Sequence, residues 1–587
     1  MDFFHVAKIF NQIEVVSSRL EMTYLLTQLF KEASAQEAKE IAYLSLGELQ
    51  PPYILSQFNF AEKSAIKVIA RLLNIKEQEV QSQLDNFGDL GLIIENFGNW
   101  NKIGHPEREQ RVEGHPELTV NQVYRKLIEI EHVSGAGSQE KKQDMVYNLL
   151  ISLNPISAKF VIRVLTGKLR LGFSDMTIVD AISFLLVGDK SARKFIEDAY
   201  NYCADIGRIV YIAKSEGLEA IKNVEVVLGI PIRPAAADRL SSAADIIEKI
   251  GTCVAQAKLD GFRLQIHVDN TQEYSFVKLF SRNLIDMTHM FPDLVAAFKK
   301  IKVKNLICEG EAISYDVNTG TFVTFQETVK RKRKHGIDLA IEEMPLRVYM
   351  FDLMYLNDKQ IMQESQLERY KKLQMIFDAD TNDMLQVISQ ERFETAEGLR
   401  EYFAKNIAAG LEGIVAKKPD APYKPGKRDS NWIKLKREET GSLDDTLDCV
   451  ILGYNFGKGK RVGFGIGALL VGVYNKQKDL FESIAKIGTG LSDEGWKEVK
   501  AKADKFKVEF KPKNVIVDKD LAPDIWVDPE IVVLVRADEI TTSPIHTVGY
   551  ALRFPRFMGY RIDKSAQDAT TSQEIIDLYN LQKNKNK

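Results

Sequence analysis

The spacing of the apolar residues changes near Pro231, and this change limits the folds that the chain can adopt. Before that point apolar residues recur at helical intervals, as Val146, Leu149 and Leu150 do at i, i+3 and i+4. Farther on they alternate, so that residues 262, 264, 266 and 268 share one face of a strand. We therefore expect a helical region followed by an α+β region.

The length of the chain and a second change in composition indicate a further domain. A chain of 587 residues is too long for one hydrophobic core. A polar segment at 438–445 leads into a region where short strands alternate with glycine-rich turns, which is typical of a small β-barrel. The expected fold is multidomain, with an all-α domain at 1–228, an α+β domain at 229–440 and a β-barrel domain at 441–587.

Composition excludes several classes of protein. The apolar runs are too short to cross a bilayer, and the N-terminus lacks the basic start and apolar core of a signal peptide. The four cysteines lie far apart, without the spacing of a zinc site or a disulfide framework. We therefore expect a cytoplasmic protein with no membrane partner. Because the net charge is −3, any nucleic-acid site must depend on local positive charge.

The most specific local signal is Lys-Leu-Asp-Gly at 258–261, followed by Arg263. Alone, such a match is more often a surface turn that enters a strand. A lysine amine is almost wholly protonated at neutral pH and cannot attack phosphorus in that form. Neighbouring cations and desolvation favour the neutral amine, so a nucleophilic lysine requires such surroundings.

Charged residues on other strands can provide these surroundings. Lys434 and Lys436 alternate and therefore share one strand face, and Glu309 and Glu311 do the same with carboxylates. Each pair alone is explained by a solvated strand face. Together with Glu412, they combine lysines suited to phosphates with carboxylates suited to Mg²⁺, which prefers oxygen ligands. This combination predicts a phosphate and metal site.

The motifs resemble those of the ATP-dependent DNA ligases of the archaeal and eukaryotic replicative type, over essentially the whole chain. They lie in family order at 258–261, 281–283, 309–315, 349–352, 412–417, 432–436 and 561–564, with further matches at 134–138, 167–172 and 552–557. The resemblance implies sealing of nicks in duplex DNA, with AMP passing from ATP to a lysine and then to a 5′-phosphate that is joined to a 3′-hydroxyl. It also implies a helical DNA-binding domain, a nucleotidyltransferase (adenylation) domain and an OB-fold domain.

The resemblance also implies the site residues. Lys258 is the expected nucleophile, Asp260 lies near the 3′-hydroxyl, and Arg282 binds the 5′-phosphate. Lys434 and Lys436 complete the catalytic set, and Glu311 and Glu412 hold Mg²⁺ or Mn²⁺. Phe351 would stack on adenine, and the alternative is a core aromatic on an alternating strand. The implied nucleotide contacts are Gln256, Lys258, Arg263, Glu311, Phe351, Glu412, Lys417, Arg428, Lys434, Lys436, Arg561 and Lys564.

DNA contacts should be to the backbone, since a nick sealer works at any sequence. Glycines before a helix can bring N–H groups to a phosphate, yet the same segment is equally an ordinary loop. The basic run at 330–334 is expected beside the DNA, and its alternative is a solvated patch or a localisation tract. Phe325 and Phe557 are either wedges in the minor groove or core residues. The implied set is Ser134, Gly135, Gly137, Ser138, Lys168, Arg170, Phe325, Lys332, Arg556 and Phe557.

One residue departs from the family pattern. Gln256 stands where the family usually has a glutamate that accepts from the adenine amino group. A glutamine carbonyl can accept that bond, but its amide can instead donate to a guanine carbonyl.

Several alternatives share part of this pattern. RNA ligases and capping enzymes use the same lysine chemistry, but the helical domain and the motif at 561–564 disfavour both. NAD-dependent DNA ligases carry a four-cysteine zinc site, and the dispersed cysteines of this chain disfavour that class. A catalytically inactive scaffold that encircles DNA is disfavoured because it would not need a nucleophilic lysine such as Lys258. We therefore expect a monomeric enzyme acting on nicked duplex DNA, associated with the nucleoid in a prokaryote, with a sliding clamp as a candidate partner.

Overall fold

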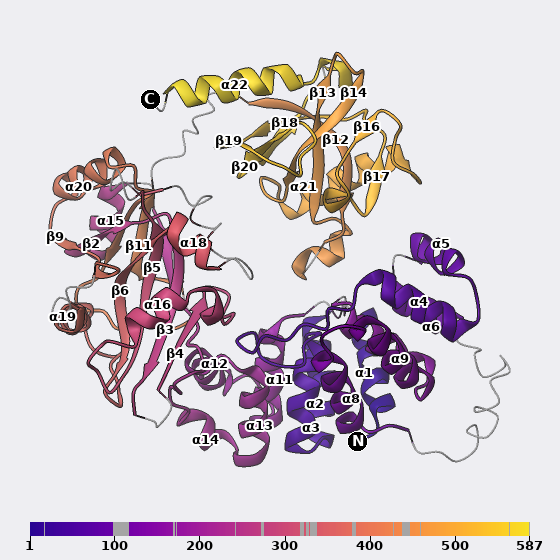
Figure 1. Cartoon of the computed structure of the whole chain (residues 1–587), viewed down its shortest axis with the longest axis horizontal. Helices are drawn as coiled ribbons and strands as arrows, with labels where there is room; N and C mark the ends of the chain where they lie inside the picture. Colours follow the sequence, from indigo (N-terminus) through magenta and orange to yellow (C-terminus); the bar gives the residue numbers. More distant parts are fainter. Residues whose placement is uncertain are drawn as a thin grey trace. The chain divides into compact units, whose positions relative to one another are not determined.

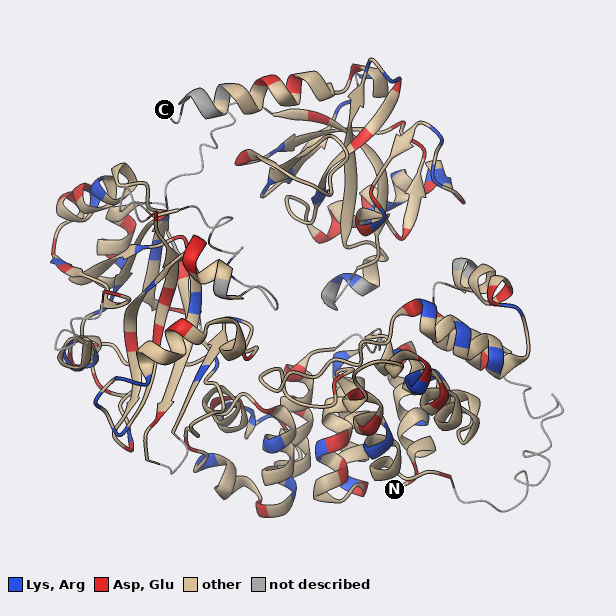
Figure 2. Cartoon of the chain, in the orientation of Figure 1, with Lys and Arg blue, Asp and Glu red and all other residues tan. Residues whose placement is uncertain are grey.

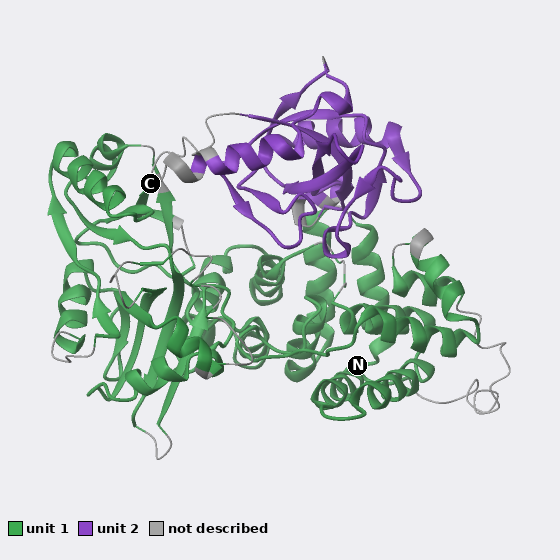
Figure 3. Cartoon of the chain, turned by 45° about the horizontal axis from the view of Figure 1, so that its top comes forward, with its two compact units in different colours: residues 1–435 green, residues 436–587 purple. Residues whose placement is uncertain are grey.

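The computed structural model describes most of the chain. The residues that it leaves out are 17, 88, 98–116, 168, 170, 172, 241, 272–274, 317–321, 324–327, 329–330, 332–336, 378–382, 427, 437–445, 458, 563 and 586–587. At a few further positions, Arg428 among them, the backbone alone is described. The chain forms two compact units, Met1–Leu435 and Lys436–Lys587 (Figure 3).

The N-terminal part of the first unit is helical, as its apolar periodicity predicts (Figure 1). Capping determines where several of these helices begin: Asn154 Oδ1 accepts from Ser157 N at 3.0 Å, and Pro155 opens the helix. The helices are α1 (Phe3–Val15), α2 (Arg19–Glu32), α3 (Ala35–Ser45), α4 (Glu62–Leu73), α5 (Glu77–Phe87), α6 (Leu90–Asn96), α8 (Val120–His132), α9 (Ser138–Ile151), α10 (Pro155–Leu165), α11 (Asp175–Val187), α12 (Arg193–Tyr202), α13 (Ile206–Glu216) and α14 (Leu218–Lys222).

One sheet of the α+β region has the strand order β1-β11-β10-β2-β9. Its outer face packs on two helices, where Ile246 and Leu399 join Ile414 and Ile433 of the strands in one apolar cluster. The elements are β1 (Ala236–Arg239), α15 (Ala243–Ile250), β2 (Cys253–Lys258), β9 (Gln390–Phe393), α20 (Ala396–Ala408), β10 (Gly413–Lys417) and β11 (Arg428–Lys436).

A second sheet has the order β4-β3-β5-β6-β7, and β8 pairs with β6. Leu294 and Phe298 of one helix and Leu373 of another cover its outer face. The alternation predicted for residues 262–268 is confirmed, since Leu264 and Ile266 lie in this core. The elements are β3 (Phe262–Asp269), β4 (Phe276–Ser281), α16 (Pro292–Phe298), β5 (Asn305–Ser314), α18 (Ile337–Glu343), β6 (Leu346–Leu356), β7 (Lys359–Gln360), α19 (Gln366–Phe377) and β8 (Leu385–Val387).

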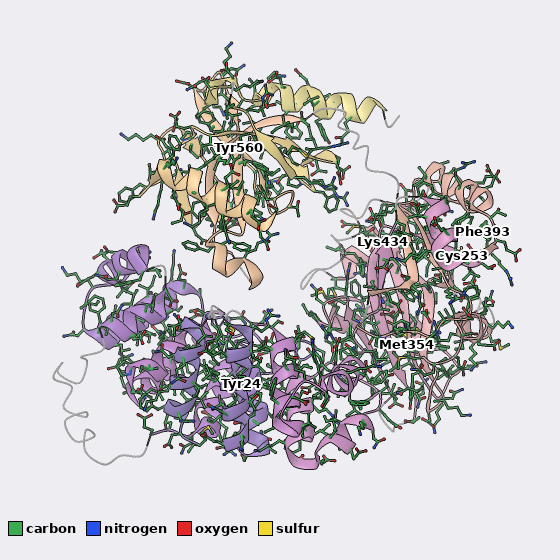
Figure 4. All side chains as sticks on the ribbon, turned by 180° about the vertical axis from the view of Figure 1, so that it is seen from behind. Tyr24, Cys253, Met354, Phe393, Lys434 and Tyr560 are labelled. Carbon is green, nitrogen blue, oxygen red and sulfur yellow. The ribbon has the colours of Figure 1, made fainter. Side chains whose placement is uncertain are left out.

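The inner faces of the two sheets meet. Ile307 and Met354 of the second sheet share a buried cluster with Trp432 of the first, and Tyr423 joins them from a loop. Figure 4 labels one residue of each sheet, Lys434 on β11 and Met354 on β6. Charged side chains that point inward from either sheet are therefore brought towards one another, and this is where the predicted nucleotide site lies.

The second unit is a half-barrel of strands around β12 (Leu447–Asn455), which pairs with β13, β17 and β18. Trp496 of α21 lies in its core. The remaining elements are β13 (Ala468–Asn475), β14 (Leu480–Ile487), α21 (Asp493–Ala503), β15 (Lys507–Val508), β16 (Val515–Ile516), β17 (Ile525–Val527), β18 (Val532–Arg536), β19 (Glu539–Thr542), β20 (Tyr550–Arg553), β21 (Arg556–Tyr560) and α22 (Ser572–Lys585).

Within the described ranges, no helix combines the length and the apolar character that crossing a bilayer requires. All four cysteines are buried and unpaired, in agreement with the absence of a disulfide framework in the sequence.

Candidate active site

Lys258 is the last residue of β2, and its Nζ contacts the carboxylate of Glu412. The pairing of β2 with β10 sets this contact, because Lys258 lies opposite Gly413 and its carbonyl accepts from Glu412 N at 3.1 Å. The expected cations are not the closest group: the side chain in contact with the proposed nucleophile is a carboxylate. Both side chains are half-buried. A carboxylate in this position can accept a proton from the ammonium group.

The turn after Lys258 depends on Gly261. A Cβ at this position would lie 2.3 Å from the carbonyl oxygen of Ala312 on β5. Glycine thus lets the backbone approach β5 closely, which brings Lys258 and Asp260 to the side of Glu311. The Lys-Leu-Asp-Gly signal therefore has a structural reason at its last position as well as a chemical one at its first.

Glu311 lies among several charges. Burial raises the pKa of Glu311 to about 7, Lys258 and Arg263 oppose the rise, and Glu412 and Asp260 add to it. Two acidic neighbours around a buried carboxyl favour a bound cation. No group of three His, Cys, Asp or Glu side chains that could hold a metal occurs among the described residues. Mg²⁺ often uses only one or two carboxylates together with waters and substrate phosphates, so Glu311 and Glu412 fit such an ion.

Arg263 is held by partners that the sequence did not identify. Its Nε and Nη2 donate to the carboxylate of Glu309 at 3.1 and 2.6 Å, and its Nη1 donates to Ala235 O at 2.7 Å. Tyr423 donates to Glu309 at 2.8 Å, so this carboxylate is paired on two sides. Burial opposes the charge on Arg263, but Glu309 more than compensates and raises its pKa. Strand alternation indicated Glu309 as an inward-facing carboxylate but not as the partner of Arg263, and Tyr423 had no sequence signal.

Lys417 also lies deep between the sheets. Its Nζ donates to Phe351 O at 2.8 Å, is 3.7 Å from Asp352 Oδ2, and is 4.2 Å from the centre of the Trp432 ring. Burial lowers the pKa of Lys417 to about 8, although Asp352 opposes this change. Asp352 is also bound by Arg369, whose Nε and Nη2 donate at 2.7 and 3.1 Å. Arg369 comes from α19, and nothing in the sequence linked it to the site.

Phe351 lies half-buried beside these groups. Its ring meets Trp432 edge to face, with centroids 6.0 Å apart, and the Arg263 guanidinium lies 5.3 Å from its centre. Lys434 and Lys436 follow Trp432 on β11 and are half-buried. Figure 2 shows that basic and acidic positions occur on neighbouring strands of this region. The contacts that join basic and acidic side chains here are those of Arg263 with Glu309 and of Lys258 with Glu412.

Other predicted residues lie around this centre. Gln256 is buried on β2 and donates to Gln390 at 3.2 Å. Arg282 is exposed in the turn after β4. The backbone of Arg428 begins β11, and its side chain is outside the described part.

The cations of the C-terminal motif share one carboxylate. Arg561 Nη1 donates to the two oxygens of Asp448 at 2.9 and 3.2 Å, and Lys564 Nζ donates to Asp448 Oδ2 at 2.7 Å. Asp448 lies on β12 of the same unit and is only 8% exposed. The sequence did not indicate this partner, which is more than a hundred residues away.

The predicted DNA-binding residues of the second unit differ in exposure. Phe557 lies in the core of the half-barrel, where its ring meets Tyr560 edge to face, so core packing is the alternative that the structure supports. Its neighbours Phe554 and Met558 are 54% and 52% exposed. Arg556 is 3.4 Å from Asp538.

The glycine-rich segment precedes a helix, as expected. Ser134, Gly135 and Gly137 are exposed, and Ser138 begins α9. Gly137 caps this helix with a φ of 75°, a conformation that glycine adopts without strain. Lys142, on the same helix, is buried and donates to the backbone carbonyl of Phe58. The predicted contacts Lys168, Arg170, Phe325 and Lys332 lie outside the described residues.

Comparison with known proteins covers nearly the whole chain. The family model "DNA ligase N terminus" matches residues 2–183, "ATP dependent DNA ligase domain" matches 234–436, and "ATP dependent DNA ligase C terminal region" matches 463–564. A probable DNA ligase of Dictyoglomus turgidum is 42% identical over 592 residues, covering 99% of this chain and 98% of that protein.

More distant proteins agree with this match. A DNA ligase of Nitrosopumilus maritimus is 36% identical over 99% of this chain and 98% of its own length. A solved structure named Pmar-Lig_Pre matches 95% of this chain and 99% of its own with a TM-score of 0.56 at 17% identity, which is a likeness of fold. With the helical, adenylation and C-terminal β domains all present, the chain belongs to the ATP-dependent DNA ligase family.

Proposed function

We propose that the protein seals nicks in duplex DNA, using ATP to activate the 5′-phosphate. The observation that carries this proposal is the contact between Lys258 and Glu412 beside Glu311, at the place where the two sheets of the adenylation domain face each other. A nucleophile, a proton acceptor and a carboxylate pair for a cation are thus combined at one point. Such a combination suits adenylyl transfer, in which positioning and charge supply most of the catalysis.

In the first step, Lys258 Nζ loses a proton and attacks the α-phosphorus of ATP. A P–N bond forms, the bond from that phosphorus to the α,β-bridging oxygen breaks, and pyrophosphate leaves with the electron pair. Glu412 is the acceptor in contact with the amine. The AMP then passes to the 5′-phosphate of the nick, and the 3′-hydroxyl displaces it to form the phosphodiester bond.

Mg²⁺, or Mn²⁺, held by Glu311 and Glu412 would supply positive charge at the phosphates. For the nucleotide itself, we propose that Phe351 stacks on the base and that Lys434 and Lys436 bind phosphate oxygens. Lys417 and Arg263 lie one layer deeper, against the rings of Trp432 and Phe351. In these positions they support the base and ribose side of the site, and Arg428 adds a further nucleotide contact.

For DNA, we propose that Arg282 binds the 5′-phosphate and that Asp260 lies near the 3′-hydroxyl. The exposed turn of Arg282 and the glycine-rich start of α9 support backbone contacts. The C-terminal domain is proposed to be an OB-fold whose Arg561 and Lys564 orient the pyrophosphate. The further DNA contacts proposed are Lys168, Arg170, Phe325, Lys332 and Arg556, whereas Phe557 packs in the core of its unit.

We place the boundaries of the three domains at 228/229 and 440/441. The protein is proposed to act as a monomer on nicked duplex DNA in the cytoplasm. A sliding clamp is proposed as a candidate partner.

Incubation with α-labelled ATP and Mg²⁺ tests the proposal. The protein should acquire a covalent label that resists alkali and is released by acidic hydroxylamine, as expected of a P–N bond. Lys258→Arg retains a positive charge beside Glu412 and should fold normally, but it should acquire no label. Lys249→Ala, a lysine on the outer helix α15, is the matched control and should label like the unaltered protein. A labelled Lys258→Arg protein would overturn the assignment of the nucleophile, and an unlabelled native protein would overturn the function.

A further inference from the structure

Three glutamine side chains meet at the inner end of the proposed base site. Gln256 of β2 lies directly opposite Gln390 of β9 in the sheet, and Gln366 approaches from the first turn of α19. Gln256 Nε2 donates to Gln390 Oε1 at 3.2 Å, and Gln366 Nε2 donates to the same oxygen at 2.8 Å. Gln390 therefore uses both lone pairs of its carbonyl oxygen on two amide groups.

This arrangement leaves one group of Gln256 available to a ligand. Because its amide is directed to Gln390, its carbonyl oxygen points the other way, and no hydrogen bond of the described residues occupies that atom. Gln256 shares its strand face with Val415, its cross-strand neighbour, and Val415 packs in the cluster that contains Phe351 and Trp432. The open carbonyl thus belongs to the wall of the aromatic site.

The reverse arrangement is less favourable for a physical reason. If Gln390 turned its amide to both neighbours, Gln256 would present an NH₂ group to the base. Gln366 Oε1 is buried without a hydrogen-bond partner in the structure. In the reverse arrangement an NH₂ group with two unpaired N–H donors would take its place, and buried orphan donors are rarer in proteins than under-satisfied carbonyls.

We propose that Gln390 and Gln366 are positioning residues that set the nucleotide preference of this chain, by making Gln256 a hydrogen-bond acceptor towards the base. An acceptor matches the 6-amino group of adenine and is repelled by the 6-carbonyl of guanine. The trio therefore does for this chain what a carboxylate would do at position 256 without help, since a carboxylate cannot donate. This inference rests on the proposed function, because it assumes that the base of the nucleotide lies against Phe351.

The test is the ratio of kcat/KM for covalent labelling by ATP to that for labelling by GTP. Sites built to hydrogen-bond one partner discriminate strongly against a mismatched one, so the unaltered protein should prefer ATP by about a hundredfold or more. Gln390→Leu removes the acceptor that orients Gln256, and the ratio should fall by about tenfold or more. Purine riboside triphosphate, which has hydrogen at position 6, should be discriminated against by the unaltered protein and much less by this variant.

Two variants of equal charge provide the matched comparison. Gln390→Glu keeps an acceptor between the two amides and should preserve or increase the preference for ATP. Gln366→Glu cannot donate, so Gln390 must turn its NH₂ group towards it, Gln256 must reverse, and the preference should move towards GTP. A general loss of packing, or a general effect of added negative charge, would change both variants in the same direction.

The outcomes separate this inference from the proposed function. If the native protein is labelled equally by ATP and GTP, or if the two glutamate variants shift the ratio in the same direction, the inference is wrong while the enzyme assignment stands. If no nucleotide labels the protein, the proposed function itself fails. Thermal melting of each variant identifies any that does not fold. If Gln390→Leu does not fold, the ATP-to-GTP ratios of Gln390→Glu and Gln366→Glu still test the inference.

Discussion

Glu311 should cost the protein stability at neutral and alkaline pH, and its replacement by glutamine should remove that cost. Burial raises the pKa of Glu311 to about 7 from its ordinary value of 4.5. The folded protein therefore binds a proton more tightly than the unfolded chain does, and the stabilisation present at acid pH is lost as pH rises through 7. Glutamine has the same shape and no charge, so Glu311→Gln should lack this pH dependence.

The magnitude follows from the two pKa values. Their difference of about 2.5 corresponds to about 3.4 kcal/mol over the full range of pH. Between about pH 5 and pH 8.5, the linkage relation gives about 2.5 kcal/mol, because part of the effect lies below pH 5. For a domain of about 200 residues, this change in the free energy of unfolding corresponds to roughly 5–10 °C in Tm. As pH rises, the stability of Glu311→Gln should therefore increase by this amount relative to the unaltered protein, although the variant loses activity.

The assay is thermal or urea unfolding of both proteins at the two pH values, with a chelator present. Glu397→Gln, at an exposed position on α20, is the control. Its free energy of unfolding should change between the two pH values as that of the unaltered protein does. Added Mg²⁺ should stabilise the unaltered protein at alkaline pH more than the variant, since only the former retains both carboxylates. A stability difference between variant and unaltered protein that is the same at both pH values would refute the reasoning.

Three further predictions concern stability. Gly261→Ala should destabilise the protein by about 1–3 kcal/mol or more in urea unfolding, because the new methyl group would collide with the backbone of Ala312; an unchanged midpoint would contradict the close approach. Asp352→Ala should cost about 3–5 kcal/mol by the same assay, since it strands Arg369 as a buried charge, and a loss below about 1 kcal/mol would show that the pair is not needed. Asp448→Ala should cost about 1 kcal/mol, because its two cations are partly exposed, and the loss should shrink in high salt; a loss that does not depend on salt would argue against an ionic origin.

The sequence predicted strand faces well where a pattern extends along one strand. Strand alternation alone is enough to put Lys434 and Lys436 on one face of β11, and the Lys-Leu-Asp-Gly signal identified Lys258 at the end of β2. Where α11 begins, Ser174 has the extended conformation of a cap and Asp175 is already helical, although either residue type suits a cap. Local patterns thus determined faces and element types, with small errors at the boundaries.

What surrounds each side chain was not predictable in the same way. Glu309 was visible as an inward-facing residue, but its pairing with Arg263 depends on the register of β3 and β5. Phe557 is one alternating residue among many, and only the folded half-barrel shows that it faces the core. The cations expected to surround Lys258 are farther from it than the carboxylate of Glu412.

The sequence by itself determined the order of the domains, the proposed nucleophile and the strand faces, because these depend on residue types and on the periodicity of single elements. Tertiary structure alone decided which partners meet: Glu412 for Lys258, Asp448 for Arg561 and Gln390 for Gln256. Their separations in the chain exceed a hundred residues. Periodicity gives the direction of a side chain from its own backbone, whereas its neighbours depend on strand register and sheet packing, which arise only when the whole domain closes around its core.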